Sequence, residues 1–234
     1  MKKIITTLAL CLMAATAFSQ SSESMTLEPQ NYFRGTFEGF YAPSRYIYTG
    51  NNDTIDDEKF TSIGLGLMVN TSLSKTVPLY LHWGIDLVFN SYKWESEPID
   101  MFGYQKTTKL EYIYFSFTYK ANIGYYLQIP NTSVGFLPYA GLFARMHIGG
   151  SSYYTYPNLH TEDNTLYDDQ VKTSLFTQSA ENPNPWNRFE LGANVGVKAF
   201  FGKFMIGVAY GRTFTDLTDD TQVSEFRLSA GLKF

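Results

Sequence analysis

A period of two runs through most of the chain: along eight segments, large apolar residues alternate with polar, charged or small ones. The segments are 32–41, 61–71, 79–90, 112–123, 136–148, 188–199, 204–211 and 225–234. Alternation of this kind is the signature of β-strands that have two different faces. Beyond the first twenty residues, no long stretch keeps the 3.6-residue apolar period of a helix. We therefore predict an all-β fold of eight strands.

The charges inside these segments share one parity. All of them occupy the face opposite the large apolar residues: Arg34, Glu38, Asp86, Lys120, Arg145, Arg188, Glu190, Lys198, Glu225, Arg227 and Lys233. A soluble sandwich or lipocalin also alternates in this way, with its polar face in water. Parity alone therefore does not decide whether the apolar face packs in a protein core or contacts lipid.

The connections between the segments favour a membrane. They alternate strictly between short (72–78, 127–133, 202–203) and long (42–59, 91–109, 149–187, 211–222). An even strand number with short turns at one end and long loops at the other is typical of outer-membrane barrels. A closed barrel also pairs every backbone polar group, as lipid demands. We predict an eight-stranded antiparallel up-and-down transmembrane β-barrel over 32–234.

A ten-stranded variant would use 151–157 and 170–177 as an extra hairpin. These stretches are polar and shorter than the roughly 9–11 residues that cross a bilayer. We interpret them as strand extensions or loop structure above the membrane.

The aromatic content fits a barrel in lipid. Aromatic and charged residues each make up 17% of the chain, whereas a typical soluble domain is about 25% charged. Rings fall near strand ends on the apolar parity, where interfacial girdles form: Phe33, Tyr41, Trp83, Phe201, Phe204 and Tyr210. The net charge of −4 and the lack of a Lys/Arg cluster argue against nucleic-acid binding.

The N-terminus reads as a secretory signal peptide over 1–19, followed by a short periplasmic segment over 20–31. Lys2 and Lys3 precede an apolar run, and Ala17-Phe18-Ser19 gives the small residues that a signal peptidase reads. Cys11, the chain's one cysteine, leaves with the signal. We expect no disulfide, no cysteine-based metal site and no cofactor.

Three stretches carry a resemblance to a known family: Ala17-Phe18-Ser19-Gln20, Leu137-Pro138-Tyr139-Ala140-Gly141 and Phe226 to Phe234. With these the chain resembles the small eight-stranded outer-membrane β-barrel proteins of Gram-negative bacteria, the porin-family or PorT-like group. The resemblance implies location in the outer membrane. The terminal strand, with Phe226, Leu228, Leu232 and Phe234 on one face, is similar to the signal read by the barrel-assembly machinery, to whose sheet edge an extended end can add.

The long loops give the barrel an acidic outer rim. They hold 15 of the 22 acidic residues, including Asp56, Asp57 and Asp168. One interpretation is a solvated surface. The other is divalent-cation bridging to lipopolysaccharide phosphates, although the run 51–58 lacks the spacing of an EF-hand. Outer-membrane lipid and lipopolysaccharide are thus the expected partners, with an extracellular or secretion-system partner left unidentified.

Charges inside a narrow eight-stranded barrel should pair, because an isolated buried charge is unfavourable. A register that opposes Arg145 with Glu190 also opposes His147 with Arg188. At the closing seam, Phe234 beside Asn31 would oppose Glu38 with Arg227. We therefore predict the lumen ion pairs Arg145–Glu190 and Glu38–Arg227 as part of a plug.

Catalysis would need a histidine beside a serine and a carboxylate near the outer leaflet. His147 has Ser151 and Ser152 close by in sequence, while His82 and His160 lie elsewhere, and no nucleophile motif flanks any of the three. We expect a non-enzymatic barrel with a side-chain-filled lumen and a structural or surface-interaction role. The alternatives are a narrow pore and an accessory barrel in protein secretion. A lipid-modifying enzyme is a further, less favoured alternative.

Overall fold

The computed structural model describes residues 34–49, 58–74, 76–101, 104–160, 165–180, 182–218 and 220–234. The predicted signal peptide, the periplasmic segment, Asn31 and Phe33 lie outside these residues. The strands are β1 (Gly35–Tyr48), β2 (Lys59–Ser72), β3 (Leu79–Glu95), β4 (Ile99–Met101), β5 (Tyr104–Lys106), β6 (Lys109–Tyr125), β7 (Leu127–Gln128), β8 (Val134–His160), β9 (Thr165–Ser174), β10 (Phe189–Phe201), β11 (Phe204–Thr213) and β12 (Thr221–Lys233). Within the described part of the chain, no helix is long and apolar enough to cross a membrane.

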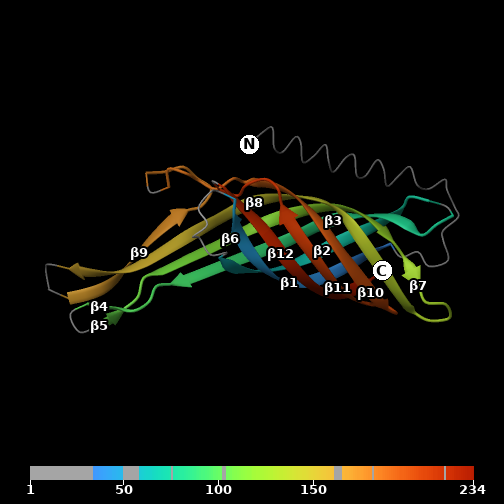
Figure 1. Ribbon diagram of the computed structural model, residues 1–234, viewed down its shortest axis with the longest axis horizontal. Helices are drawn as coiled ribbons and strands as arrows, with labels where there is room; N and C mark the ends of the chain where they lie inside the picture. The colour runs from blue at the N-terminus through green and yellow to red at the C-terminus, as the bar shows by residue number, and fades with distance from the viewer. Residues whose placement is uncertain are drawn as a thin grey trace.

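Eight of these strands close into a barrel (Figure 1). Neighbours run in the order β10-β11-β12-β1-β2-β3-β6-β8, and β8 pairs back with β10. Each of these pairings is antiparallel. The predicted eight-stranded antiparallel barrel is confirmed.

The turn end of the barrel carries the short connections and the C-terminus. Gly202 has a φ of 61°, a left-handed conformation that glycine adopts without strain, and it turns the chain between Phe201 and Phe204. Phe234 exchanges backbone hydrogen bonds with Gly35, each with an N···O distance of 3.0 Å. The opposite end, with the long connections, is called the loop end below.

The register at the closing seam differs from the sequence prediction. Glu38 lies opposite Gly231 rather than Arg227, so the predicted pairing of Phe234 with Asn31 is wrong by four residues. A shift by an even number of residues keeps every side chain on its face, so alternation could not detect it. Between β8 and β10, Glu190 lies opposite Arg145, as in the predicted register.

The two faces of the barrel wall have opposite character. Inward-facing positions are buried and mostly polar or aromatic, whereas outward-facing positions carry exposed apolar side chains, such as Leu142, 62% exposed. Exposed rings occur towards both ends of this belt, although Phe117 and Tyr119 stand between the ends. They include Phe201, Phe204 and Phe234 at the turn end, and Tyr41, Phe115, Phe189, Tyr210 and Phe226 towards the loop end. Such a belt needs an apolar surrounding.

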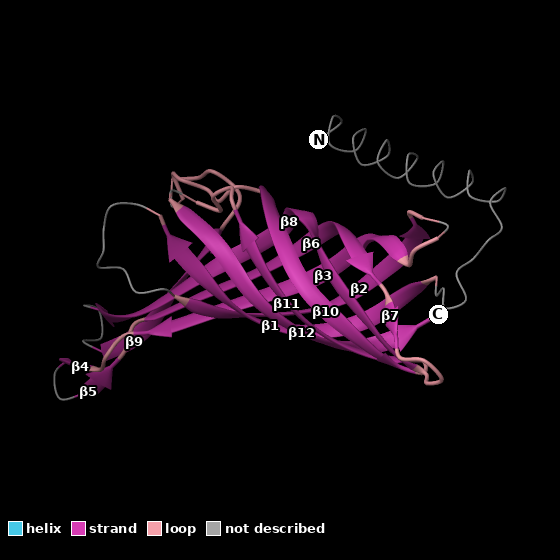
Figure 2. Ribbon diagram, turned by 45° about the vertical axis from the view of Figure 1, so that its right-hand side comes forward, coloured by secondary structure: helices cyan, strands magenta, loops and turns pink. Residues whose placement is uncertain are grey.

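At the loop end, part of the wall continues as a flat extension (Figure 2). β8 runs on to His160 and pairs with β9 from Ser151 opposite Ser174 to His160 opposite Thr165. β3 and β6 follow it as far as the pair Glu95–Lys109, and the hairpin β4–β5 lies beside the tip. The stretch 151–157 is thus a strand extension, as interpreted from the sequence, and does not add strands to the barrel.

Candidate functional site

The lumen is the place where the chain gathers its buried polar chemistry. Four basic and four acidic side chains meet inside the barrel wall: Lys120, Arg145, Lys198, Arg227, Glu38, Asp86, Glu190 and Glu225. They form two layers, with charges balanced over the whole set. Balance of this kind is expected where water is excluded.

In the layer nearer the turn end, Arg227 is the bridging residue. Its Nη2 atom lies 2.8 Å from Glu38 Oε1, and its Nη1 atom lies 2.5 Å from Asp86 Oδ2. Lys120 Nζ is 2.8 Å from Asp86, and Lys198 Nζ is 2.7 Å from Glu38. Each carboxylate therefore receives two cationic donors.

The structure brings Glu38 and Arg227 together in spite of the register shift. Glu38 lies opposite Gly66 on one side and Gly231 on the other, so neither neighbouring strand fills the space beside it. A Cβ atom at Gly66 would collide with Asp86 Oδ1 and lie 3.3 Å from Arg227 Nη2. The long arginine side chain reaches along the lumen into this gap, with its guanidinium 3.4 Å from the centre of the Phe40 ring.

His82 extends this layer in its neutral form. Lys198 Nζ lies 3.0 Å from His82 Nε2, and because an ammonium can only donate, Nε2 accepts. The proton therefore sits on Nδ1, which donates to Asn70 Oδ1 at 2.6 Å.

The layer nearer the loop end is a chain of hydrogen bonds and ion pairs that crosses seven of the eight barrel strands. It runs through Ser44, Ser62, Asn90, Ser116, His147, Glu190, Arg145 and Glu225. Arg145 Nη1 lies 3.6 Å from Glu190 Oε2, and Nη2 lies 2.5 Å from Glu225 Oε2. Arg145 thus meets its predicted partner and, at shorter distance, a second carboxylate.

His147 is placed by a β-bulge. The pairing of β6 with β8 shifts between Phe115 and Ser116, so that Ile148 is extra and His147 lies opposite Ser116. His147 Nε2 donates to Glu190 Oε2 at 2.9 Å, and Nδ1 lies 2.8 Å from Ser116 Oγ. The hydroxyl partner is therefore Ser116 and not Ser151 or Ser152, the two serines suggested by the sequence.

An aromatic lid covers this layer at the loop end. The Phe176 ring stacks on the His147 ring, with the ring centres 5.2 Å apart and an interplanar angle of 12°. Trp186 packs edge-on against Tyr46, Tyr112 and Tyr114. We call Leu175, Phe176, Trp186 and Leu217 the lid, since they close over buried rings of the wall.

The turn end is closed as well, by Tyr80, Tyr126, Leu137, Phe200 and Met205. Between the two closures the inward-facing polar groups are almost inaccessible, with Ser116, His82 and Glu190 each 0% exposed. A continuous water channel would expose these groups. The lumen is therefore filled by side chains over the described residues.

Sequence reasoning missed most of the cross-lumen partners. The missed partners lie on the same strand face as the predicted pairs, so the alternation did place them in the lumen: Asp86, Lys120, Lys198 and Glu225. Which of these side chains come into contact depends on how the barrel closes. Phe176 and Trp186 carry no alternation signal at all.

The residues of the predicted assembly signal lie on the outer wall. Phe226, Leu228, Leu232 and Phe234 are 45–56% exposed along one face of β12. Among the predicted rim acids, Asp53, Asp56 and Asp57 lie outside the described residues, and Asp168 forms an ion pair with Lys106 at 2.9 Å. No group of three or more potential metal-ligating side chains occurs among the described residues.

No protein-family profile and no curated protein matches the sequence. Among solved structures, the chain is similar to Ail, the attachment invasion locus protein of Yersinia pestis, with 14% identity, a TM-score of 0.42, and coverage of 87% of this chain and 100% of that chain. It is also similar to Neisserial surface protein A, with 11% identity, a TM-score of 0.45, and coverage of 86% and 97%. A third is the N-terminal beta-barrel domain of Pseudomonas aeruginosa OprF, with 12% identity, a TM-score of 0.27, and coverage of 86% and 100%.

The fold is that of a small outer-membrane β-barrel. It is evident in the strand pairings, the closed seam and the exposed apolar belt.

Proposed function

We propose that the chain is an integral outer-membrane protein with a closed lumen, whose role is structural or lies in surface interaction. The observation that carries this proposal is the inversion of the two faces, apolar outside and charged inside. Along β12 and the residue that follows it, the outward positions from Phe226 to Phe234 are apolar over nine residues, and about 9–11 residues cross a bilayer in a tilted strand.

The filled lumen favours a structural core over a pore. Its charges are paired across the interior, and both ends are closed by apolar side chains. Opening a path for ions would separate buried charges, which is unfavourable. An accessory role in protein secretion rests on the family resemblance alone.

The extension offers the surface for interaction. β8 and β9 present exposed rings outside the barrel, including Tyr154 and Tyr167, each over 40% exposed. Ion pairs join the strands there: Lys93 to Glu111 at 2.8 Å and Lys109 to Glu95 at 3.3 Å. The Thr107 hydroxyl, which donates to Glu95, together with Lys109 holds the pKa of the Glu95 carboxyl below its usual range. Such contacts keep the extension ordered above the membrane.

A simple experiment tests the membrane barrel. The full chain, expressed with its signal, should stay in the outer-membrane fraction after alkaline carbonate washing and migrate more slowly in a detergent gel after boiling. Release by carbonate together with unchanged migration would contradict the proposal.

One observation favours a second function, ester hydrolysis. Ser116, His147 and Glu190 are connected as nucleophile, base and carboxylate are in hydrolytic triads. Ser116, however, is fully buried, it also accepts from Asn90 Nδ2 at 3.2 Å, and Phe176 covers the histidine. We infer a structural hydrogen-bond chain, and incubation of the folded barrel with labelled phospholipid or lipopolysaccharide should release no fatty acid.

A further inference from the structure

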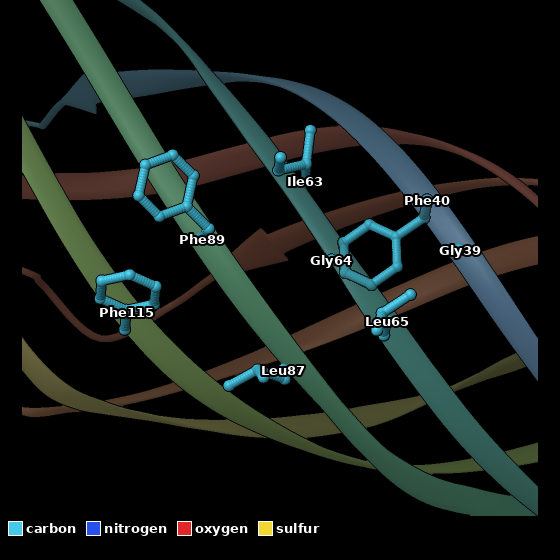
Figure 3. Close-up of a pocket in the computed structure, with 8 residues that line it drawn as sticks. All are labelled: Gly39, Phe40, Ile63, Gly64, Leu65, Leu87, Phe89 and Phe115. Atoms are coloured by element: carbon cyan, nitrogen blue, oxygen red, sulfur yellow. The ribbon is translucent and has the colours of Figure 1, made fainter.

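The barrel wall leaves no strand edge open over the described residues. Each of the eight barrel strands pairs with a neighbour on both sides. The hollow on the outer face, which is lined by Leu65, Phe89 and Phe115 among others, lies over strands that pair with one another (Figure 3). Backbone groups that could bind a further strand therefore have to lie outside the barrel, in the extension.

β9 forms an open edge of the extension. In the described part of the chain it pairs with β8 alone. It is ten residues long, it contains neither proline nor glycine, and its register with β8 is unbroken. Natural proteins block such edges with proline, with bulges or by keeping the strand short, and β9 has none of these features. The edge is therefore able to accept a further strand.

The backbone groups on the open side of β9 belong to its even-numbered residues. The Leu175 N–H donates to the Gly150 carbonyl at 3.2 Å, in step with the β8–β9 register, so the odd-numbered residues direct their backbone groups to β8. The Ser174 carbonyl faces the other way and accepts from Asn182 Nδ2 at 2.7 Å. Because Asn182 occupies that end, the open part of the edge runs from residue 166 to residue 172.

The charges on this edge are complementary to themselves. Asp168 and Lys172 lie on one face of β9, on either side of Gln170, and all three side chains are exposed. When a second copy of β9 runs antiparallel with its Gln170 opposite this Gln170, Asp168 of each copy lies opposite Lys172 of the other. Opposite charges on directly paired residues stabilise a pair of strands.

The neighbouring antiparallel registers fail on charge or on backbone direction. A two-fold axis at Asp168 or Asp169 places like charges opposite each other, which is destabilising. An axis at Val171 places Asp168 opposite Ser174, whose carbonyl already has a donor. An axis between two residues pairs even-numbered with odd-numbered residues, and the backbone groups of the latter face β8. The edge therefore favours the register centred on Gln170.

The present contacts of the two charged side chains are compatible with this register. Lys106 Nζ lies 2.9 Å from Oδ1 of Asp168, and one carboxylate can take two cationic donors, as the lumen carboxylates do. Lys172 Nζ lies 5.4 Å from the centre of the Tyr153 ring. Such a contact uses the face of the ring and no hydrogen-bond acceptor, so the ammonium keeps donors for a carboxylate.

We propose that two copies of the chain associate through their β9 edges, antiparallel and centred on Gln170. The interface uses the same edge on both copies, so it closes as a dimer and does not continue into a fibre. In this register Ser174, at the barrel end of β9, lies opposite residue 166, near the tip of the other copy. The two turn ends therefore point in opposite directions, and the two barrels belong to facing outer membranes. The proposal rests on the surface-exposed membrane barrel proposed above and names a second copy as its partner.

Cysteine cross-linking tests the register. The chain is expressed with its signal, purified from outer membranes in detergent and oxidised, and the wild type, whose one cysteine is Cys11 in the predicted signal, is the blank. Gln170→Cys should form a disulfide-linked dimer, since the opposed Cα atoms would lie about 5.5 Å apart. Lys172→Cys alone should not, because its two copies would lie about 13 Å apart along the strands. Mixed with Asp168→Cys, however, it should cross-link.

Charge exchange tests the partner. Asp168→Lys and Lys172→Asp each place like charges opposite one another, so each should weaken self-association about tenfold, measured by analytical ultracentrifugation in detergent. A mixture of the two variants should associate like wild type, because each then offers the charge that the other lacks. Gln170→Pro, which removes a backbone donor from the open side alone, should abolish association. Lys203→Gln, at an exposed position of the turn end, is the control and should associate like wild type.

Each outcome decides. A monomeric wild type together with uncross-linked Gln170→Cys would overturn the pairing, as would a dimer that Asp168→Lys leaves unchanged. Cross-linking of Lys172→Cys alone as fast as that of Gln170→Cys would refute the register. The shift in gel mobility on boiling is recorded for every variant. A wild-type chain that keeps the shift but does not associate contradicts the β9 interface alone, whereas a wild-type chain without the shift contradicts the membrane barrel itself.

Discussion

The Arg227 guanidinium on β12 bonds the Asp86 carboxylate on β3, with Nη1 2.5 Å from Oδ2, across a lumen in which β1 and β2 separate the two strands. The same guanidinium holds Glu38 on β1 at 2.8 Å. One side chain thus ties three strands together from the inside. This contact joins β12 and β3, which are not neighbours and therefore cannot be held together by backbone pairing.

Removing the charge of Asp86 should destabilise the barrel. Asp86→Asn leaves Arg227 and Lys120 with one carboxylate fewer, and breaking a buried ion pair costs about 3–5 kcal/mol. Urea-induced unfolding in detergent, followed by gel mobility, measures the change. Glu95→Gln on the exposed extension is the control and should leave stability nearly unchanged, because solvent screens an exposed ion pair. An equally small effect of Asp86→Asn would refute the network's role.

A side chain at Gly66 should damage the same layer without removing a charge. In Gly66→Val the added atoms collide with Asp86 and crowd Arg227, and overpacking typically costs about 1–3 kcal/mol. Gly39→Leu, on the outer wall of the neighbouring strand, is the matched control, since its Cβ has only an ordinary contact of 3.9 Å with Leu65. The prediction fails if both variants unfold at the same urea concentration as wild type.

Opening the lid should expose the upper layer. Cys11 is the chain's one cysteine and belongs to the predicted signal, so Ser62→Cys gives a single buried reporter in the folded barrel. Trp186→Ala removes the ring contacts with Tyr46, Tyr112 and Tyr114, and maleimide labelling of the reporter should become roughly tenfold faster or more. Labelling that is already fast with the lid intact would show that the loop end is open.

Ser116 should matter for stability and not for chemistry. Ser116→Ala leaves His147 Nδ1 without its hydroxyl partner and Asn90 Nδ2 with the Tyr114 carbonyl alone, a loss of about 1–3 kcal/mol. Neither wild type nor the variant should release fatty acid from labelled lipid. Release by wild type that Ser116→Ala abolishes would instead establish Ser116 as a nucleophile.

The sequence predicted the faces of the barrel but not the contacts inside it. Parity alone placed Glu38 and Arg227 in the lumen, and loop lengths indicated closure and even strand number. Asp86 and Arg227 lie on strands that are not neighbours, so their contact depends on the curvature of the closed wall and on the space at Gly66, neither of which alternation encodes.

The lid is a second feature that could not be predicted from the alternation of the sequence. Phe176 and Trp186 lie in an irregular segment, and their positions follow from packing on His147 and Tyr114 rather than from a periodic pattern. The seam was predicted four residues out of register because a shift by four leaves the parity of every residue unchanged.

Conductance is the most direct test of a membrane barrel with a closed lumen. The mature chain is refolded, shown by the boiling-dependent gel shift to be a barrel, and inserted into a planar bilayer from proteoliposomes of the same preparation. We predict no stepwise conductance above the bare bilayer, for wild type and for Lys203→Gln alike. Stable unitary current steps from the wild-type barrel would contradict the filled lumen and identify the protein as a pore.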